Sequence, residues 1–201
     1  MGTSESHIYQ YLRMMDSLRG PSIPAEYTYM SYEDYVLDRG SFETSRALSV
    51  EQTALVRAYS RTTRPKVKEC YYNAQSLALF DPSRFVYREG WAIGSTIPVM
   101  HAWCVLDGAC VIDLTWRQGK FGGRNYATTA RRIRGVLPAG WEYLGVSYSV
   151  PEIKEQLRVN RAWCCFHDNW RQGHPLLKNP RLAPRETPIS PGLCDILRET
   201  V

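Results

Sequence analysis

Val99-Met-His-Ala-Trp-Cys-Val-Leu106 is followed by Asp107-Gly108 and then by Ala109-Cys-Val-Ile-Asp113. Both flanking runs are apolar, and Asp-Gly is a pair that tolerates the positive φ angles of a tight turn. Two such runs around Asp-Gly are typical of a β-hairpin. The stretch therefore predicts an antiparallel sheet in the middle of the chain.

The loop of this hairpin decides which residues face each other. A three-residue loop ending in a left-handed glycine, Gly108, would pair Val105 with Ala109. His101 would then lie directly opposite Asp113, on the face that we expect to meet the helix before the hairpin. A two-residue loop would instead turn Asp113 to the other face.

Helical patterns precede the hairpin, and strand patterns surround it. The predicted helices are 4–19, 31–40, one opened by Ser49-Val-Glu-Gln52, 69–80 and one starting at 150. The predicted strands are 84–92, 99–106, 109–115, 141–149 and 162–166. Residues 117–135 are predicted to form a loop. Helices followed by antiparallel strands indicate an α+β fold. We expect one domain over 1–173, with its core at about 49–166, and a Pro-rich tail over 174–201.

The composition is that of an ordinary globular protein. Of 201 residues, 44% are hydrophobic and 22% are charged, and the net charge is +5 at pH 7. This mild basicity indicates nucleic acid only weakly. We expect a solvated surface, with an anionic partner as the alternative. Two groups of basic residues motivate that alternative: Arg57, Arg61, Arg64, Lys66 and Lys68, and Arg124, Arg131, Arg132 and Arg134.

The six cysteines are expected to be free thiols. The N-terminal sequence MGTSESHIYQYLRMM lacks the basic and then apolar pattern of a signal peptide. No stretch approaches the roughly 18 apolar residues of a membrane span. We therefore expect a cytoplasmic protein without membrane contact, in which thiols stay reduced. In the hairpin register above, Cys104 and Cys110 would pair directly.

Cys70 begins the predicted helix 69–80. A thiol is a strong nucleophile only as a thiolate, which a helix N-terminus and a neighbouring imidazolium both favour. Taken alone, Cys70 is most simply a small core residue. With His101 as base and Asp113 as the carboxylate that orients it, however, Cys70 would complete a Cys-His-Asp triad.

Four segments carry a resemblance to a known family. The chain resembles the transglutaminase-like branch of the papain-like cysteine enzymes in Glu69-Cys-Tyr-Tyr-Asn-Ala74, Tyr87-Arg-Glu-Gly90, His101-Ala-Trp103 and Val111-Ile-Asp-Leu-Thr-Trp116, and more weakly in Tyr143-Leu-Gly-Val146. The resemblance implies a papain-like core, in which the Cys-bearing helix packs on an antiparallel sheet, with a helical N-terminal extension. The family includes peptidases, cross-linking enzymes, deamidases and inactive members.

The resemblance also implies the role of each residue. Cys70 would be the nucleophile, His101 the general base and then acid, and Asp113 the residue that orients the imidazole. Papain-type relatives carry a glutamine upstream of the cysteine for the oxyanion hole, and Arg64 lies at the comparable distance here. The backbone N–H of Cys70 would then carry more of that role.

Other residues near these motifs are candidates for substrate contacts. Trp103 and Trp116 are predicted to line the substrate-binding cleft beside Cys70, with packing in the core as the alternative. Asn73 could contact substrate or the catalytic strand, although an ordinary buried tie between helix and sheet is the favoured interpretation. Glu89 could face a basic substrate group, although a solvated strand edge is simpler.

Two rival constellations are weaker. Cys164-Cys165-Phe166-His167 with Cys194 could suggest zinc, but adjacent cysteines on a strand point to opposite faces and the Cys-x2-Cys spacing is missing. His167 and Asp168 could form a rival general base oriented by a carboxylate, but no hairpin holds these two residues in place. We therefore expect no metal and no cofactor.

The sequence thus predicts an acyl-transfer enzyme that forms a thioester on its cysteine. It would be an amide hydrolase, peptidase, deamidase or transglutaminase-type enzyme acting on a protein, a peptide or a small amide. Hydrolysis is the simpler default, because no residue pattern indicates an amine site. The alternative is a non-catalytic binding protein on the same fold, with an anionic or protein partner.

Overall fold

A computed structural model describes residues 6–19, 25–94, 97–118, 131–167, 169 and 173–178. The helices are α1 (His7–Ser17), α2 (Tyr32–Arg39), α3 (Val50–Thr63), α4 (Cys70–Phe80), α6 (Val150–Asn160) and the 3₁₀ helix η3 (Pro175–Leu177). The strands are β1 (Ser41–Phe42), β2 (Phe85–Ile93), β3 (Val99–Leu106), β4 (Cys110–Gln118), β5 (Arg131–Gly135) and β6 (Glu142–Tyr148). The predicted α+β class is confirmed.

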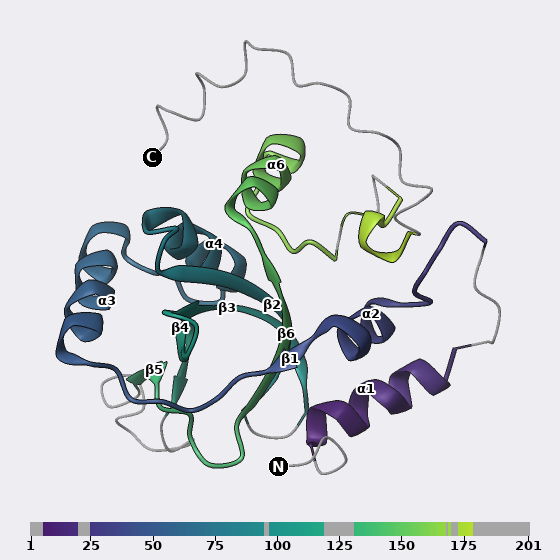
Figure 1. Cartoon of the computed structure of the whole chain (residues 1–201), viewed down its shortest axis with the longest axis horizontal. Helices are drawn as coiled ribbons and strands as arrows, with labels where there is room; N and C mark the ends of the chain where they lie inside the picture. The colour runs from purple at the N-terminus through teal and green to yellow at the C-terminus, as the bar shows by residue number, and fades with distance from the viewer. Residues whose placement is uncertain are drawn as a thin grey trace.

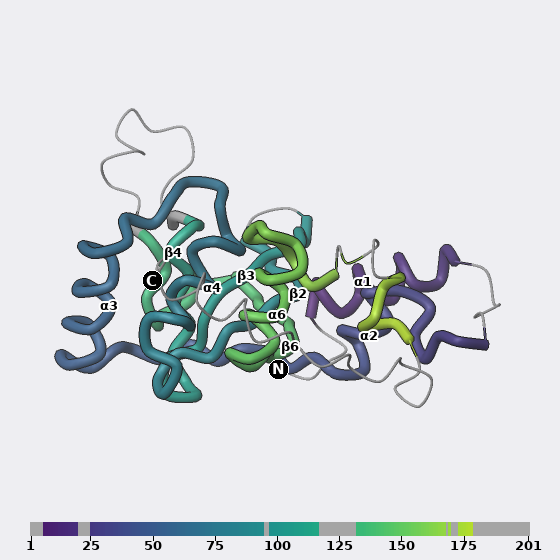
Figure 2. Tube along the Cα trace, turned by 90° about the horizontal axis from the view of Figure 1, so that it is seen from above, coloured from purple at the N-terminus to yellow at the C-terminus, as the bar shows by residue number. Residues whose placement is uncertain are grey.

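The strands form one antiparallel sheet in the order β1-β6-β2-β3-β4-β5. Helices α3 and α4 lie toward one end of the molecule, and α1 and α2 toward the other (Figures 1 and 2). α4 packs against the central strands β2, β3 and β4. The helix that carries Cys70 is therefore supported by the middle of the sheet.

Helix starts follow the capping residues in the sequence. The Ser49 hydroxyl accepts a hydrogen bond from the backbone N–H of Gln52, and the side-chain oxygen of Gln52 accepts one from the backbone N–H of Ser49. The same reciprocal box opens α6 between Ser149 and Glu152. Such boxes satisfy N–H groups that a helix start otherwise leaves without partners. Local sequence is thus sufficient to place both starts.

The two faces of the sheet carry different clusters of buried side chains. One face meets α4 and includes Cys104, Leu106, Cys110 and Ile112. The buried members of the other cluster all come from strands; they are Ala92, Trp103, Val105, Val111, Ile133 and Tyr143. Cys104, Leu106, Cys110 and Ile112 thus lie on the opposite face from Trp103, Val105 and Val111, as the alternation of side chains along a strand requires.

The predicted register of the hairpin is wrong by two positions. Leu106 pairs with Cys110 and Cys104 with Ile112, so the three-residue loop is Asp107 to Ala109. Cys104 and Cys110 are free thiols that do not pair with each other. Continued along the strands, this register would place His101 opposite residue 115 rather than opposite Asp113. A shift of two residues keeps every side chain on its predicted face, because the period of a strand is two.

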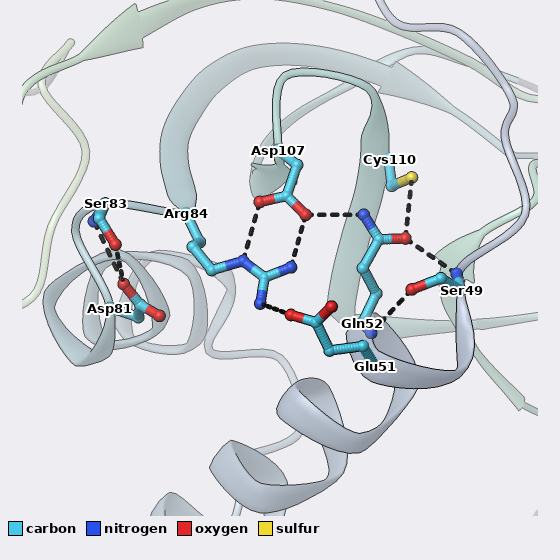
Figure 3. Close-up of polar contacts among 8 residues, drawn as sticks. All are labelled: Ser49, Glu51, Gln52, Asp81, Ser83, Arg84, Asp107 and Cys110. Atoms are coloured by element: carbon cyan, nitrogen blue, oxygen red, sulfur yellow. Dashed lines mark hydrogen bonds and ion pairs between the residues drawn. The ribbon is translucent and has the colours of Figure 1, made fainter.

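Contacts from outside the hairpin fix its turn. Asp107 and Gly108 both have positive φ, 52° and 68°. The Arg84 guanidinium donates to both carboxylate oxygens of Asp107, at 2.9 and 2.7 Å, and Gln52 Nε2 donates to one of them at 2.7 Å (Figure 3). Arg84 also binds Glu51 at 2.6 Å. These bonds hold Asp107 in a left-handed conformation that is uncommon outside glycine.

Three other predictions need correction. Arg131–Gly135 is a strand rather than part of a loop, and the predicted strand 162–166 has no regular structure. The expectation that His101 lies on the face covered by the Cys70 helix is also wrong, because the body of α4 packs on the face of Cys104. Of the predicted tail, residues 175–177 form η3, with Leu177 buried. Residues 179–201 lie outside the described residues, so the domain boundary stays a prediction.

Candidate active site

Cys70 is the first residue of α4, as the sequence predicts. It is half-buried, and the preceding residue, Glu69, makes no side-chain capping hydrogen bond. No acidic residue lies in the first turn of α4. The positive end of the helix dipole at Cys70 is thus not offset by an acidic residue of the first turn.

The sheet brings a histidine and a carboxylate to this sulfur. His101 Nε2 lies 2.8 Å from Oδ2 of Asp113, and both side chains are buried. The Cys70 side chain is near enough to the imidazole of His101 to contribute, after Asp113, to raising the pKa of that ring. Because Asp113 occupies Nε2, the nitrogen left to face Cys70 is Nδ1. The structure thus places a thiol, an imidazole and a carboxylate close together, with a hydrogen bond between the last two.

A separation of two strands lets α4 reach His101. β3 and β4 pair only from Cys104 to Leu106 and from Cys110 to Ile112. Beyond these pairs, β4 has an irregularity between Asp113 and Arg117 in its pairing with β5. The first turn of α4 contacts both strands here, with Cys70 meeting His101 and Asn73 meeting Thr115. The helix thus reaches the site at the point where the strands part, although its body covers the other face.

Four donors surround the carboxylate of Asp113. The backbone N–H groups of Thr115 and Trp116 donate to Oδ1 at 2.8 and 3.1 Å, and the hydroxyl of Tyr143 donates to Oδ2 at 2.9 Å, beside His101. Burial alone would raise the pKa of Asp113, but the charge and hydrogen bond of His101, with both N–H groups, lower it. Asp113 is therefore held as a carboxylate in one orientation.

The imidazole of His101 is enclosed by aromatic rings. Trp116 stacks on it with centroids 4.4 Å apart and an interplanar angle of 22°, and Tyr143 lies at 6.2 Å. Burial lowers the pKa of His101, but the charge and hydrogen bond of Asp113 and the contact with Cys70 outweigh it and raise the pKa to about 9. At neutral pH the ring therefore holds a proton that a reaction at Cys70 could use.

The side chain of Asn73, in α4, connects the turn before α4 to strand β4. Its side-chain oxygen accepts from Lys66 N at 2.8 Å, and its amide nitrogen donates to Lys66 O at 2.7 Å and to Thr115 Oγ1 at 2.8 Å. Both amide hydrogens are thus used within the protein, which favours the structural interpretation over substrate binding. Asn73 fixes the segment before Cys70 to the strand that carries Asp113.

Of the two predicted cleft tryptophans, only one is at an edge of the site. Trp116 is half-buried and covers His101, whereas Trp103 is fully buried, with its indole N–H donating to Glu43 at 3.0 Å. Trp103 therefore packs as part of the core. Arg64, the residue at the position of the family's glutamine, is exposed and ends α3 with a positive φ of 49°.

Glu89 is neither exposed nor at a strand edge, contrary to both interpretations of the sequence. It is 0% exposed on the central strand β2 and accepts hydrogen bonds from Tyr87 OH at 2.7 Å and from the backbone N–H groups of Phe166 and His167. Burial raises its pKa to about 7, although these hydrogen bonds act in the opposite direction. Glu89 thus anchors the segment after α6 to the sheet.

Sequence reasoning missed the contribution of Tyr143. Its segment carries the weaker part of the family resemblance, but nothing in that segment indicates a partner 30 residues away in sequence. Only the pairing of β6 with β2 brings this ring to Asp113. A buried tyrosine in a strand generally has a partner for its hydroxyl, which is the signal that could have prompted the search.

The alternative zinc site and the alternative His167–Asp168 pair gain no support from the described residues. His167 stacks on Tyr32 at 4.4 Å; Asp168 and Cys194 lie outside the described residues. Within the described ranges, no group of three or more histidine, cysteine or acidic side chains is placed to hold a metal ion. No helix in those same ranges is long and apolar enough to cross a membrane.

The arrangement as a whole can perform nucleophilic chemistry. A thiol at a helix start contacts a protonated imidazole, which a buried carboxylate orients. No family model, no curated protein and no solved structure matches this chain. The resemblance to the transglutaminase-like enzymes therefore stays a prediction that rests on the residues themselves.

Proposed function

We propose that this protein is a cysteine-nucleophile enzyme that transfers an acyl group from an amide or a related carbonyl compound through a thioester on Cys70. The observation that carries the proposal is the buried, hydrogen-bonded pair of His101 and Asp113 beside Cys70, the first residue of α4. Asp113 is further fixed by Tyr143 and by two backbone N–H groups. A constellation oriented to this extent supports a chemical role over a packing role.

The first half of the reaction forms the thioester. The sulfur of Cys70 attacks the carbonyl carbon, and the electron pair of the carbonyl moves to its oxygen. The carbon–nitrogen bond then breaks as His101 donates the proton at Nδ1 to the leaving amine. Asp113 stays ionised throughout and holds the ring at Nε2. The developing oxyanion would be stabilised by N–H groups at the start of α4, the backbone N–H of Cys70 among them.

The second half releases the acyl group. His101, now neutral, removes a proton from a water molecule or an amine, which attacks the thioester carbon. The carbon–sulfur bond breaks, and the sulfur leaves as a thiolate beside the reprotonated ring. Water gives hydrolysis and an amine gives transfer. We propose hydrolysis, because water needs no binding site of its own, as an amine would.

The proposal is tested with p-nitrophenyl acetate as the acyl donor. We expect intact-mass spectrometry to detect one added acetyl group during turnover of the native chain. The variant Cys70→Ala should keep its fold and remain without the acetyl group. Cys164→Ala, which removes another half-buried cysteine, is the matched control and should be acetylated normally. Acetylation of Cys70→Ala at the native rate would overturn the assignment of the nucleophile.

A further inference from the structure

The fold brings two basic segments together that are far apart in sequence. One comprises the second half of α3 and the turn that leads to Cys70, and the other is strand β5. Arg132 of β5 donates from Nη2 to the carbonyl oxygen of Pro65 at 3.0 Å, which joins the two. The segment before α3 lies against the same strand, because Arg46 N donates to Gly135 O at 3.2 Å.

The charges of α3 are divided between its sides. Arg57, Arg61 and Arg64 follow one another at intervals of four and three residues, so they share one stripe of the helix, and all three are exposed. Burial and, to a smaller extent, the charge of Arg57 lower the pKa of Arg134 of β5. Glu51 instead binds Arg84 beside the hairpin turn (Figure 3). The acid of α3 is therefore directed away from its arginines.

We define the basic surface as Arg46, Arg57, Arg61, Arg64, Lys66, Lys68, Arg132 and Arg134. Within the described part of the chain, none of Arg57, Arg61, Arg64, Lys66, Lys68 and Arg134 forms an ion pair. Of the nearby acids, Glu69 is exposed, whereas Glu43 is half-buried and binds Arg88 at 2.8 Å. Cations held together in excess of the acidic residues near them repel one another, and a bound anion relieves that repulsion.

The basic surface ends beside the candidate active site. Lys66 and Lys68 lie in the turn directly before Cys70, and Asn73 holds this turn through both the N–H and the C=O of Lys66. Lys68 has a positive φ of 64°, so its backbone is in a sparsely populated conformation two residues before Cys70. A ligand that spans the basic surface would therefore continue toward the sulfur.

We propose that the basic surface binds an acidic peptide segment, next to the acyl group that Cys70 attacks. The identity of the substrate rests on the proposed function, whereas binding to the surface does not. A peptide is favoured over nucleic acid for two reasons. The adjoining chemistry acts on amides, and the ring of Tyr72, beside Lys66, already contacts Lys66 Nζ at 4.3 Å and Trp163 at 5.2 Å, so it offers little room for a stacked base.

Binding is measured first, with Cys70→Ala so that no reaction interferes. We expect a fluorescent oligo-glutamate peptide to bind at low salt, to be released by added salt, and to bind more tightly than an oligo-glutamine peptide of equal length. The variant R57Q/R61Q/R134Q should bind it about eightfold more weakly, since each lost surface cation weakens binding by a factor of about two. If that variant unfolds, R57Q/R61Q alone should bind about fourfold more weakly.

The matched control removes the same charge elsewhere. R13Q/R39Q/K154Q changes exposed residues of α1, α2 and α6 and should bind the peptide as the parent does. Equal losses in this control and in the test variant would overturn the proposal, because net charge alone would explain them. Tighter binding of a single-stranded oligonucleotide of equal charge would also overturn it, in favour of nucleic acid.

Labelling of Cys70 tests the position of the peptide. An oligo-glutamate peptide carrying a chloroacetyl group should alkylate Cys70 of the native chain at least about tenfold faster than its oligo-glutamine counterpart, and R57Q/R61Q should reduce this ratio. Slow labelling by both peptides would count against Cys70 as the nucleophile. The binding measurement alone would then test whether the basic surface binds an acidic peptide. Rapid but equal labelling by both would overturn the peptide proposal and leave the nucleophile in place.

Discussion

The hydroxyl of Tyr143 donates to Oδ2 of Asp113 at 2.9 Å, the same oxygen that lies 2.8 Å from His101 Nε2. Two strands that are not neighbours in the sheet, β6 and β4, thus meet at one carboxylate. A buried carboxylate with four donors cannot turn without losing hydrogen bonds to charged groups, each of which contributes about 1.5–3 kcal/mol. Asp113 is therefore fixed before any substrate arrives.

Tyr143→Phe should destabilise the protein and slow the reaction of Cys70. The change leaves the ring in place but removes one donor, so we expect the free energy of unfolding in urea to fall by about 1.5–3 kcal/mol. Tyr11→Phe is the control and should change stability little. Tyr11 is a half-buried tyrosine of α1 that packs on Trp91 of β2. An unchanged free energy of unfolding in Tyr143→Phe would mean that its hydroxyl does not hold Asp113.

Asp113→Asn should lower the pKa of His101 and slow alkylation of Cys70. In the folded protein this pKa is about 9, above the ordinary value of 6.5, because the charge and hydrogen bond of Asp113 outweigh burial. The protonated ring therefore stabilises the native chain fully below pH 6.5, and this contribution is lost as the pH rises through about 9. We expect Asp113→Asn to lose this dependence in denaturant titrations between pH 6 and pH 9.

The alkylation of Cys70 by iodoacetamide gives a second readout for the same variant. At pH 7 the native Cys70 should react faster than Cys104, Cys110 and Cys165, which are buried. In Asp113→Asn the rate should fall at least about tenfold, since a neutral ring no longer favours the thiolate. Peptide mapping follows each cysteine separately, and preferential labelling of Cys164 in the native chain would contradict the assignment of Cys70.

Asn73→Ala should loosen the connection between the turn before Cys70 and β4. It removes three hydrogen bonds, so the expected loss in the free energy of unfolding is about 2–4 kcal/mol. Because the turn positions Cys70, its alkylation at pH 7 should also slow. Asn160→Ala, which removes one bond at the end of α6, is the control and should leave the alkylation rate unchanged. Equal alkylation rates in both variants would reduce Asn73 to a purely structural role.

Glu89→Gln should abolish one part of the pH dependence of stability. The pKa of Glu89 is raised by burial from 4.5 to about 7, so the folded state holds this proton more tightly than the unfolded state. Its contribution is therefore greatest below pH 4.5 and declines as the pH rises to about 7. Thermal denaturation between pH 4.5 and pH 7.5 measures the decline, and an identical pH profile in Glu89→Gln would show that Glu89 does not titrate in this range.

Local sequence determined the parts of this protein that depend on near neighbours. The capping serines place the starts of α3 and α6, and Cys70 at the start of α4 follows from the pattern of its own helix. Alternation along β3 and β4 also assigns His101 and Asp113 to one face. These features were predictable because capping and strand alternation involve residues only a few positions apart.

Tertiary structure alone decided the register of the hairpin, because Arg84 and Gln52, both from outside it, hold Asp107 in its left-handed conformation. It also decided that Tyr143 completes the surroundings of Asp113, and that Glu89 is buried rather than solvated. Each of these depends on side chains distant in sequence that the sheet brings within hydrogen-bonding distance. A pattern read along one strand contains no information about which distant residue will supply the partner.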